Sequence, residues 1–465
     1  MRRFCLLGLY ILWLLPSSPA WGWGEEGHCI VLDSACQALP EPARSFYAAQ
    51  LPFLLAHAID PDDWSLIDPE EARRHYLDLE LLGPEPLANL PTTYQEALAR
   101  FGPETLSQAG TLPWTILEFL GKLTGANRQG DWERSALLAA ALGHYLADSC
   151  MPLHTTVNYK GELTGNLILP DRADHRHVHV RFEVAMLRQF QEELRSSVPA
   201  QVVPAQPMDD PFALLRRLLS ESHASIDPIL RTDKELTDSF GARFDAEFYS
   251  SLYERTGELA EERLARAAQA TASFWLSAWQ LAGRPELPRE RVAFGEQVLL
   301  MERGHLDGPE QRATKVFVKD GAAYWVVSAD WPEAGRFRAR GPLASDAYQG
   351  LWRELEGASV WELEEAPSPA RMGPTVTVTV ARQGREHSFT VEAPEAQQDT
   401  RYGRIYRAIR TVAPQTPGPE PVRPEQALQP RSGQTLRRSL PGRWLGSVSQ
   451  RPGRREALDI RKQGA

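Results

Sequence analysis

The sequence predicts a mainly α fold: an all-α helical domain over 23–284, then a small α+β domain over 290–413, then a disordered basic tail over 414–465. Apolar residues recur with helical spacing throughout the first segment. Alternating apolar residues and hairpin turns characterise the second. The third is rich in Pro and Arg and poor in aliphatic residues, so it cannot bury enough apolar area to offset the entropy of ordering.

The first 22 residues have the features of a secretory signal peptide. Arg2 and Arg3 precede an apolar run over 4–15, and Ala20 and Gly22 are small residues before a cleavage point after Gly22. The run is too short to span a membrane, and no later apolar run reaches that length. We therefore expect a secreted or periplasmic protein without a transmembrane segment. The net charge of −10 argues against a protein that coats polyanions in general.

Helical patterns divide the first domain into a series of segments. They cover 29–39, 41–59, 91–126 with breaks, 131–150, 175–196, 209–231 and 243–282. The sequence Asp60-Pro-Asp-Asp-Trp64 predicts an acidic turn. Within and after it, Asp62, Asp63 and Asp68 are expected to be solvated turn residues rather than ligands.

The second domain shows two hairpin patterns. The first joins strands over 315–319 and 324–328 through Asp320-Gly321, and the second joins 375–380 to 387–391. A short strand is predicted over 360–363, and helices over 346–355 and 401–412. This domain shows no catalytic constellation, and its sequence predicts no role for it.

Two His-x-x-x-acid pairs dominate the helical domain: His144 with Asp148, and His179 with Glu183. On an α-helix, residues four apart lie on one face, so each pair directs an imidazole and a carboxylate to one point. A divalent metal prefers these donors. A single pair is more often a solvated surface pair, but Ala and Leu flank the first one, which indicates burial.

Further candidate donors lie before and between these pairs. Pro152 is expected to end the helix and let His154 turn back toward a second metal. Cleavage after Gly22 would expose the Trp23 α-amine, which can chelate a metal together with its own carbonyl. In chain order, the candidate metal ligands are Trp23, His28, Asp60, His75, His144, Asp148, His154, His179 and Glu183.

This order and spacing resembles the superfamily that unites zinc-dependent phospholipases C with single-strand-specific zinc nucleases, over about residues 23–283. The resemblance implies an all-α fold, three zinc ions and hydrolysis of a phosphodiester by a metal-activated hydroxide. It implies one zinc at Asp60, His75, His144 and Asp148, a second at His154, His179 and Glu183, and a third at Trp23 and His28, with Asp148 bridging the first and third. It also implies a role for Asp60 as ligand or base, and for Tyr76 and Asp78 in binding the substrate.

The resemblance leaves the substrate open. The motif Trp23-Gly-x-x-Gly-His28 is similar to the nucleases, whereas Glu183 matches the phospholipases, and Asp63 replaces an arginine of the nuclease pattern. The sequence favours slightly the cleavage of single-stranded nucleic acid or nucleotides. Phospholipase C activity on phospholipid head groups is the alternative, and a non-catalytic zinc-stabilised binding protein is the second alternative. No protein partner is predicted.

Overall fold

A computed structural model describes the chain from residue 23 to residue 413, with the exception of 66–67, 170–176, 294, 305–310, 320–321, 332–334, 365–373, 384 and 393–399. The signal peptide predicted over 1–22 and the tail predicted over 414–465 lie outside the described residues. All described residues fall within one compact unit.

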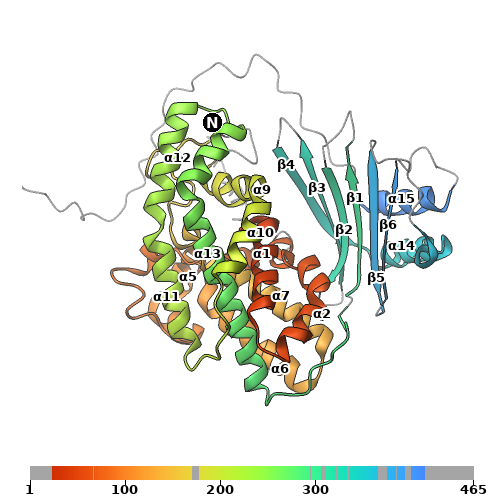
Figure 1. Cartoon of the computed structure of the whole chain (residues 1–465), viewed down its shortest axis with the longest axis horizontal. Helices are drawn as coiled ribbons and strands as arrows, with labels where there is room; N and C mark the ends of the chain where they lie inside the picture. The colour runs from red at the N-terminus through yellow and green to blue at the C-terminus, as the bar shows by residue number, and fades with distance from the viewer. Residues whose placement is uncertain are drawn as a thin grey trace, which may run out of the picture. The chain divides into compact units, whose positions relative to one another are not determined.

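The described chain up to Leu281 is helical, which confirms the predicted mainly α fold (Figure 1). The helices are α1 (Gly24–Ala38), α2 (Ala43–Ala56), α3 (Asp60–Ser65), α4 (Pro69–Ala72), η1 (Arg73–His75), η2 (Leu79–Leu82), α5 (Tyr94–Ala109), α6 (Leu112–Gln129), α7 (Trp132–Ser149), η3 (Pro152–Thr155), α8 (Val178–Val180), η4 (Arg181–Met186), α9 (Leu187–Gln189), α10 (Gln191–Gln201), α11 (Pro211–Ala224), α12 (Ile226–Phe240) and α13 (Ala246–Leu281). Of these, η1, η2 and η3 are 3-10 helices and η4 is a π-helix. No helix within the described ranges is both long and apolar enough to cross a membrane.

The centre of the helical core is formed by α1, α7 and α13. The buried Trp275 of α13 donates its indole N–H to the Ala139 carbonyl of α7 (3.0 Å) and stacks on Tyr47 of α2. A Cβ added to Gly143 of α7 would lie 2.4 Å from the end of the Leu32 side chain of α1, so a larger residue there would require Leu32 to move. Gly143 is next to His144 in the sequence and packs against α1 at this point.

Helix α7 ends where the sequence predicts. Asp131 caps its N-terminus by accepting a hydrogen bond from the backbone N–H of Arg134, and the last helical residue is Ser149. Pro152 then begins the 3-10 helix η3, where its fixed φ is favourable and its missing N–H costs nothing. This change of direction brings His154 back toward α7.

The second part of the chain contains a six-stranded antiparallel sheet in the order β4-β3-β2-β1-β5-β6 (Figure 1). The strands are β1 (Gln297–Arg303), β2 (Gln311–Lys319), β3 (Ala322–Trp331), β4 (Gly335–Leu343), β5 (Thr375–Arg382) and β6 (Arg385–Glu392), and the helices are α14 (Ser345–Gly357), η5 (Val360–Glu362) and α15 (Arg401–Val412). With its two longer helices, this part confirms the predicted α+β architecture.

Side chains alternate between the two faces of this sheet. On one face, Val298 of β1 is opposite Val316 of β2 and Val380 of β5, and these residues pack with the apolar sides of α14 and α15. On the other face, Phe317 and Val326 belong to the apolar core of the helical part. Strand β2 therefore carries residues of both cores.

Two expectations about local structure are wrong, and two strands are missed. The predicted acidic turn is the helix α3, in which Asp62 and Asp63 are buried. The predicted strand over 360–363 is largely the 3-10 helix η5. The sequence does not predict strands β1 and β4: residues 298–301 of β1 form an unbroken apolar run although their burial alternates, and β4 contains Gly and Pro, which indicate a turn but are tolerated at a sheet edge.

Candidate metal centre

Three groups of buried His, Asp and Glu side chains lie next to one another in the helical part. They come from α1, α3, η1, α7, η3, α8 and η4, which bring together residues up to 155 positions apart in the sequence. In each group, one possible ligand atom of every residue lies within 4.8 Å of the others. The groups are His28, His144 and Asp148; Asp62, His75 and His144; and His154, His179 and Glu183.

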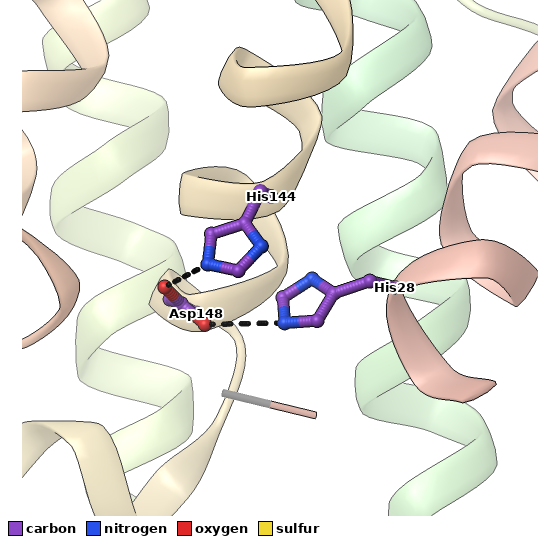
Figure 2. A group of neighbouring side chains, drawn as sticks. All are labelled: His28, His144 and Asp148. Atoms are coloured by element: carbon purple, nitrogen blue, oxygen red, sulfur yellow. Dashed lines mark ion pairs between the residues drawn. The ribbon is translucent and has the colours of Figure 1, made fainter. Parts of the chain in front are cut away.

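The first group joins α1 to α7 (Figure 2). His144 Nε2 lies 3.4 Å from Asp148 Oδ2, one helical turn along α7, as the His-x-x-x-acid spacing predicts. His28 of α1 faces the other oxygen, with 3.7 Å between its Nε2 and Asp148 Oδ1. The His28 and His144 rings are stacked, with centroids 3.8 Å apart. Two imidazoles and one carboxylate thus converge from two helices.

The second group also includes His144, through the same Nε2 that faces Asp148. This Nε2 is 3.1 Å from His75 Nδ1 and 3.6 Å from Asp62 Oδ1, and Asp62 Oδ1 is also 3.7 Å from His75 Nδ1. The other nitrogen of His144, Nδ1, donates to the Ala58 carbonyl (2.9 Å). A hydrogen bond of this kind fixes the tautomer and the ring orientation, and is typical of histidines that bind metals.

The third group joins η3 to the segment that contains α8 and η4. His179 Nε2 lies 2.7 Å from Glu183 Oε2, and His154 Nε2 lies 3.7 Å from the same oxygen. His154 Nδ1 donates to the His75 carbonyl (2.7 Å), which orients its Nε2 toward Glu183. Glu183 lies in the π-helix η4, so the second His-x-x-x-acid pair spans a transition from α- to π-helix.

The Asp148 carboxylate connects the three groups. Besides His28 and His144 in its own group, Asp148 Oδ2 lies 2.9 Å from His75 Nδ1, and Oδ1 lies 3.8 Å from His154 Nδ1. Burial raises the pKa of Asp148 to about 8, with His154 opposing the rise. A fully buried carboxylate without a cation is unfavourable, because ionisation in a low dielectric is costly.

Burial also keeps the imidazoles neutral. Burial is the main cause that holds the pKa values of His28, His144 and His179 well below the ordinary value. Neighbouring imidazoles lower these pKa values further. In His75, burial lowers the pKa to about 4. Neutral imidazole is the form that binds a metal, so the environment favours ligands over cations.

A metal ion would satisfy polar atoms that the protein leaves unsatisfied. Each buried polar atom without a hydrogen bond costs about 1–3 kcal/mol, and here several such atoms converge on one region. Zn²⁺ prefers imidazole nitrogen and carboxylate oxygen in groups of three or four, so the residues fit zinc. The buried atoms without hydrogen-bond partners include both ring nitrogens of His28, His75 Nε2, Asp148 Oδ1, His179 Nε2 and both carboxylate oxygens of Glu183.

Asp60 lies outside the three groups. Its carboxylate contacts His57 Nδ1 (2.6 Å) and Lys315 Nζ (2.6 Å). Burial alone would raise the pKa of Asp60, but His57 and Lys315 outweigh it and hold the pKa well below its ordinary value. Asp62, two residues later, joins the second group instead. Ligation or base catalysis by Asp60 therefore remains a prediction, and its sequence neighbour Asp62 is the carboxylate that faces His75 and His144.

Trp23 lies immediately before α1 and is fully buried. Its indole N–H donates to the Ala147 carbonyl (2.9 Å), one residue before Asp148. A Cβ added to Gly27 would lie 2.6 Å from the Cβ of Trp23, so glycine there permits this packing. The indole anchors the start of α1 against α7, and the role of the Trp23 amine as a ligand remains a prediction.

Tyr76 and Asp78, which the resemblance predicts to bind the substrate, lie just after η1 in the sequence. Burial raises the pKa of Tyr76 to about 12, and the nearby Asp78 and Tyr159 raise it further. Burial raises the pKa of Asp78 to about 8, with a further contribution from Glu80. Gly110, with φ of +88°, lies against this segment, and a Cβ there would be 2.1 Å from the Tyr76 carbonyl oxygen.

Tyr159 is a residue that the sequence did not single out. Its ring centroid lies 5.5 Å from that of His179, beside the third group. The only signal was a turn-rich loop between the two motif helices, which does not predict where an aromatic side chain points. Tyr159 is thus an additional candidate for contact with a ligand.

No family model matches the chain, and no curated protein matches it. Solved structures are similar to it at low identity. The alpha toxin from Clostridium absonum has 13% identity and a TM-score of 0.31, and the match covers 80% of this chain and 84% of the toxin. The Clostridium perfringens alpha-toxin isolated from avian strain SWCP has 10% identity and a TM-score of 0.29, with 81% and 98% covered. Both TM-scores are below 0.5, so these similarities establish nothing about activity.

Proposed function

We propose that the protein is a zinc-dependent phosphodiester hydrolase whose zinc ligands are the residues of the three groups. One observation carries this proposal: the groups adjoin one another around the Asp148 carboxylate, whose two oxygens lie near imidazoles of all three groups, whereas His144 has a single free nitrogen and can serve only one ion. An isolated structural zinc site is closed by four ligands of its own. Adjoining sites that share ligands are typical of hydrolases that use several metal ions on one phosphate.

When bound, zinc ions at such sites neutralise charge that develops on the phosphodiester oxygens and lower the pKa of water near them. The protein contributes the orientation of the ligands. The hydrogen bonds from His144 to Ala58 and from His154 to His75 hold both rings in the neutral tautomer with Nε2 directed into the groups. At pH 7, Asp78 is mostly protonated because its pKa is about 8, so it can donate a hydrogen bond to a phosphate or head-group oxygen.

Within this class, we propose a phospholipid head group as the substrate, in place of the nucleic acid that the sequence slightly favours. Glu183 is the residue that resembles the phospholipases. At the position of the nuclease arginine, the chain has the buried Asp63, which cannot stabilise an anionic transition state. A net charge of −10 also opposes binding of a long polyanion. Nucleic acid remains the second candidate because of the spacing between Trp23 and His28.

The test is a substrate panel with purified protein that begins at Trp23 and has been reconstituted with zinc. Phosphatidylcholine vesicles, single-stranded DNA and RNA, and a chromogenic phosphodiester would be compared at equal protein concentration. We expect release of a phosphorylated head group from the vesicles, and loss of that release after treatment with a chelator. Release of acid-soluble nucleotides without release of a head group would favour the nuclease reading.

Two histidine variants provide a matched control. His179→Ala removes a ligand of the third group, and we expect loss of one zinc and of most turnover. His387→Ala removes a histidine of β6 whose Nε2 contacts the Leu363 carbonyl, away from the three groups, and should keep both. Bound zinc without turnover on any member of the panel would contradict the enzyme proposal and support a non-catalytic binding protein.

A further inference from the structure

The sheet directs one cationic side chain to the helix that carries Asp62. Lys315 of β2 lies on the same face as Phe317, which is part of the helical core. Its Nζ is 2.6 Å from Asp60 Oδ1 and 3.6 Å from Asp63 Oδ2. The Lys315 side chain is 13% exposed, and the side chains of Asp60 and Asp63 are 6% and 2% exposed. These ion pairs are thus largely removed from water.

Helix α3 needs such a cation because of its own sequence. Asp60, Asp62 and Asp63 place three buried carboxylates within four residues. Buried negative charges repel one another and are unfavourable unless they are paired. His57 contacts Asp60 from the end of α2, and Lys315 contacts both Asp60 and Asp63. Asp62 is the carboxylate of this helix that faces the imidazoles of the second group.

We infer that Lys315 is a positioning residue for the metal centre: its ammonium group holds Asp60 and Asp63, and thereby keeps Asp62 directed at His75 and His144. This inference rests on the proposed metal centre. It gives the sheet a function, because the ligand geometry of the second group then depends on a residue of β2. Without this ammonium group, repulsion among the three carboxylates would turn α3 outward and withdraw Asp62.

Gln50 offers a matched structural control. Its Oε1 accepts hydrogen bonds from the backbone N–H groups of Val292 and Ala293 (2.9 and 3.0 Å), and its Nε2 donates to the Glu290 carbonyl (3.1 Å). These bonds tie the segment before β1 to α2 without contacting α3. Gln50→Leu should therefore destabilise the protein without changing the position of Asp62.

The experiment compares Lys315→Met, Lys315→Arg and Gln50→Leu in the mature chain by two readouts. The first is zinc content by elemental analysis. The second is amide hydrogen exchange of residues 60–65, measured on metal-free protein. For Lys315→Met we expect loss of about one zinc equivalent and exchange about a hundredfold faster, because it removes the ammonium group that contacts two buried carboxylates. Lys315→Arg should keep most of the zinc and most of the protection from exchange, and Gln50→Leu should keep the zinc.

The double variant Lys315→Met, Asp60→Asn tests the electrostatic origin of the effect. Removing one carboxylate should restore part of the protection of residues 60–65, and it should restore folding if Lys315→Met alone does not fold. Unchanged zinc content and exchange in Lys315→Met would overturn the inference, as would equal zinc loss in Gln50→Leu. If the wild-type protein binds no zinc, the proposed function fails, and exchange in metal-free protein still decides the role of Lys315.

Discussion

Arg181 and Asp233 form a fully buried two-point ion pair that anchors the segment carrying His179 and Glu183. The guanidinium Nε lies 2.6 Å from Asp233 Oδ1 and Nη2 lies 2.7 Å from Oδ2. Arg181 is the first residue of the π-helix η4 and Asp233 belongs to α12. The arginine is thus located between the two ligands of one His-x-x-x-acid pair, and α12 determines where that pair points.

Breaking this pair should destabilise the protein strongly. Arg181→Met leaves the buried Asp233 carboxylate without its cation, with the Asn166 amide as a remaining donor, and such a loss costs about 3–5 kcal/mol. We expect this loss in the free energy of unfolding, measured by urea denaturation of metal-free protein. Lys234→Met, which removes an exposed ion pair with Asp238 on the same helix, should cost about 0–1 kcal/mol. Equal effects of the two substitutions would contradict the assigned importance of Arg181.

Asp148→Asn should reduce zinc binding more than Glu183→Gln. Asp148 lies within 4 Å of imidazoles from all three groups, whereas among the described histidines the imidazoles that contact Glu183 belong to His154 and His179 of the third. Both substitutions keep the size of the side chain and remove its charge. Elemental analysis after dialysis against limiting zinc should show about one equivalent lost for Glu183→Gln and more than one for Asp148→Asn. Equal losses would show that Asp148 does not link the sites.

Correct processing before Trp23 should be required for full metal content. The resemblance places one zinc at His28 and the α-amine of Trp23. A peptide nitrogen in place of that amine is not a comparable donor. A variant that retains one additional residue before Trp23 should therefore bind about one zinc fewer and lose most activity.

Trp23→Phe separates this effect from packing. It removes the hydrogen bond from the indole to Ala147 and part of the buried ring volume but keeps the terminal amine, so zinc content should be retained. Unchanged zinc content in the extended variant would remove the amine from the ligand set.

The sequence could predict those parts of the fold and centre that depend on local spacing. His144 and Asp148 lie one helical turn apart and make contact because the helix period alone brings them together. His179 and Glu183 also make contact, but the chain passes from α- to π-helix between them, which the spacing does not predict. The end of α7 before Pro152 follows from the restricted backbone of proline, and the chain then brings His154 next to His179 and Glu183.

The other parts of the centre depend on packing between distant segments, which no local sequence pattern predicts. Asp60 and Asp62 are the same residue type in one acidic segment, so the sequence does not distinguish them. Only the orientation of α3 determines which one faces His75. Burial of three acidic residues in α3 is counterintuitive from sequence, because charged residues are rarely buried without partners. The partner here is Lys315, 255 residues after Asp60, in a strand whose pattern indicates only a hairpin.

The stability of metal-free protein should fall as the pH rises from about 4 to about 8 in part through Asp78. Its pKa in the folded protein is about 8, mainly because of burial, against an ordinary value of 3.8. Between these values the folded state retains a proton that the unfolded state has released, so the free energy of unfolding decreases with pH and the loss is complete above about 8. Asp78→Asn removes this proton and should flatten the profile, measured by urea denaturation between pH 5 and pH 9.

Tyr76→Phe is the control, because the pKa of Tyr76 is about 12 and lies outside that range. Parallel profiles for wild-type protein and Asp78→Asn would mean that Asp78 is ionised at neutral pH, and would then exclude it as a hydrogen-bond donor to the substrate.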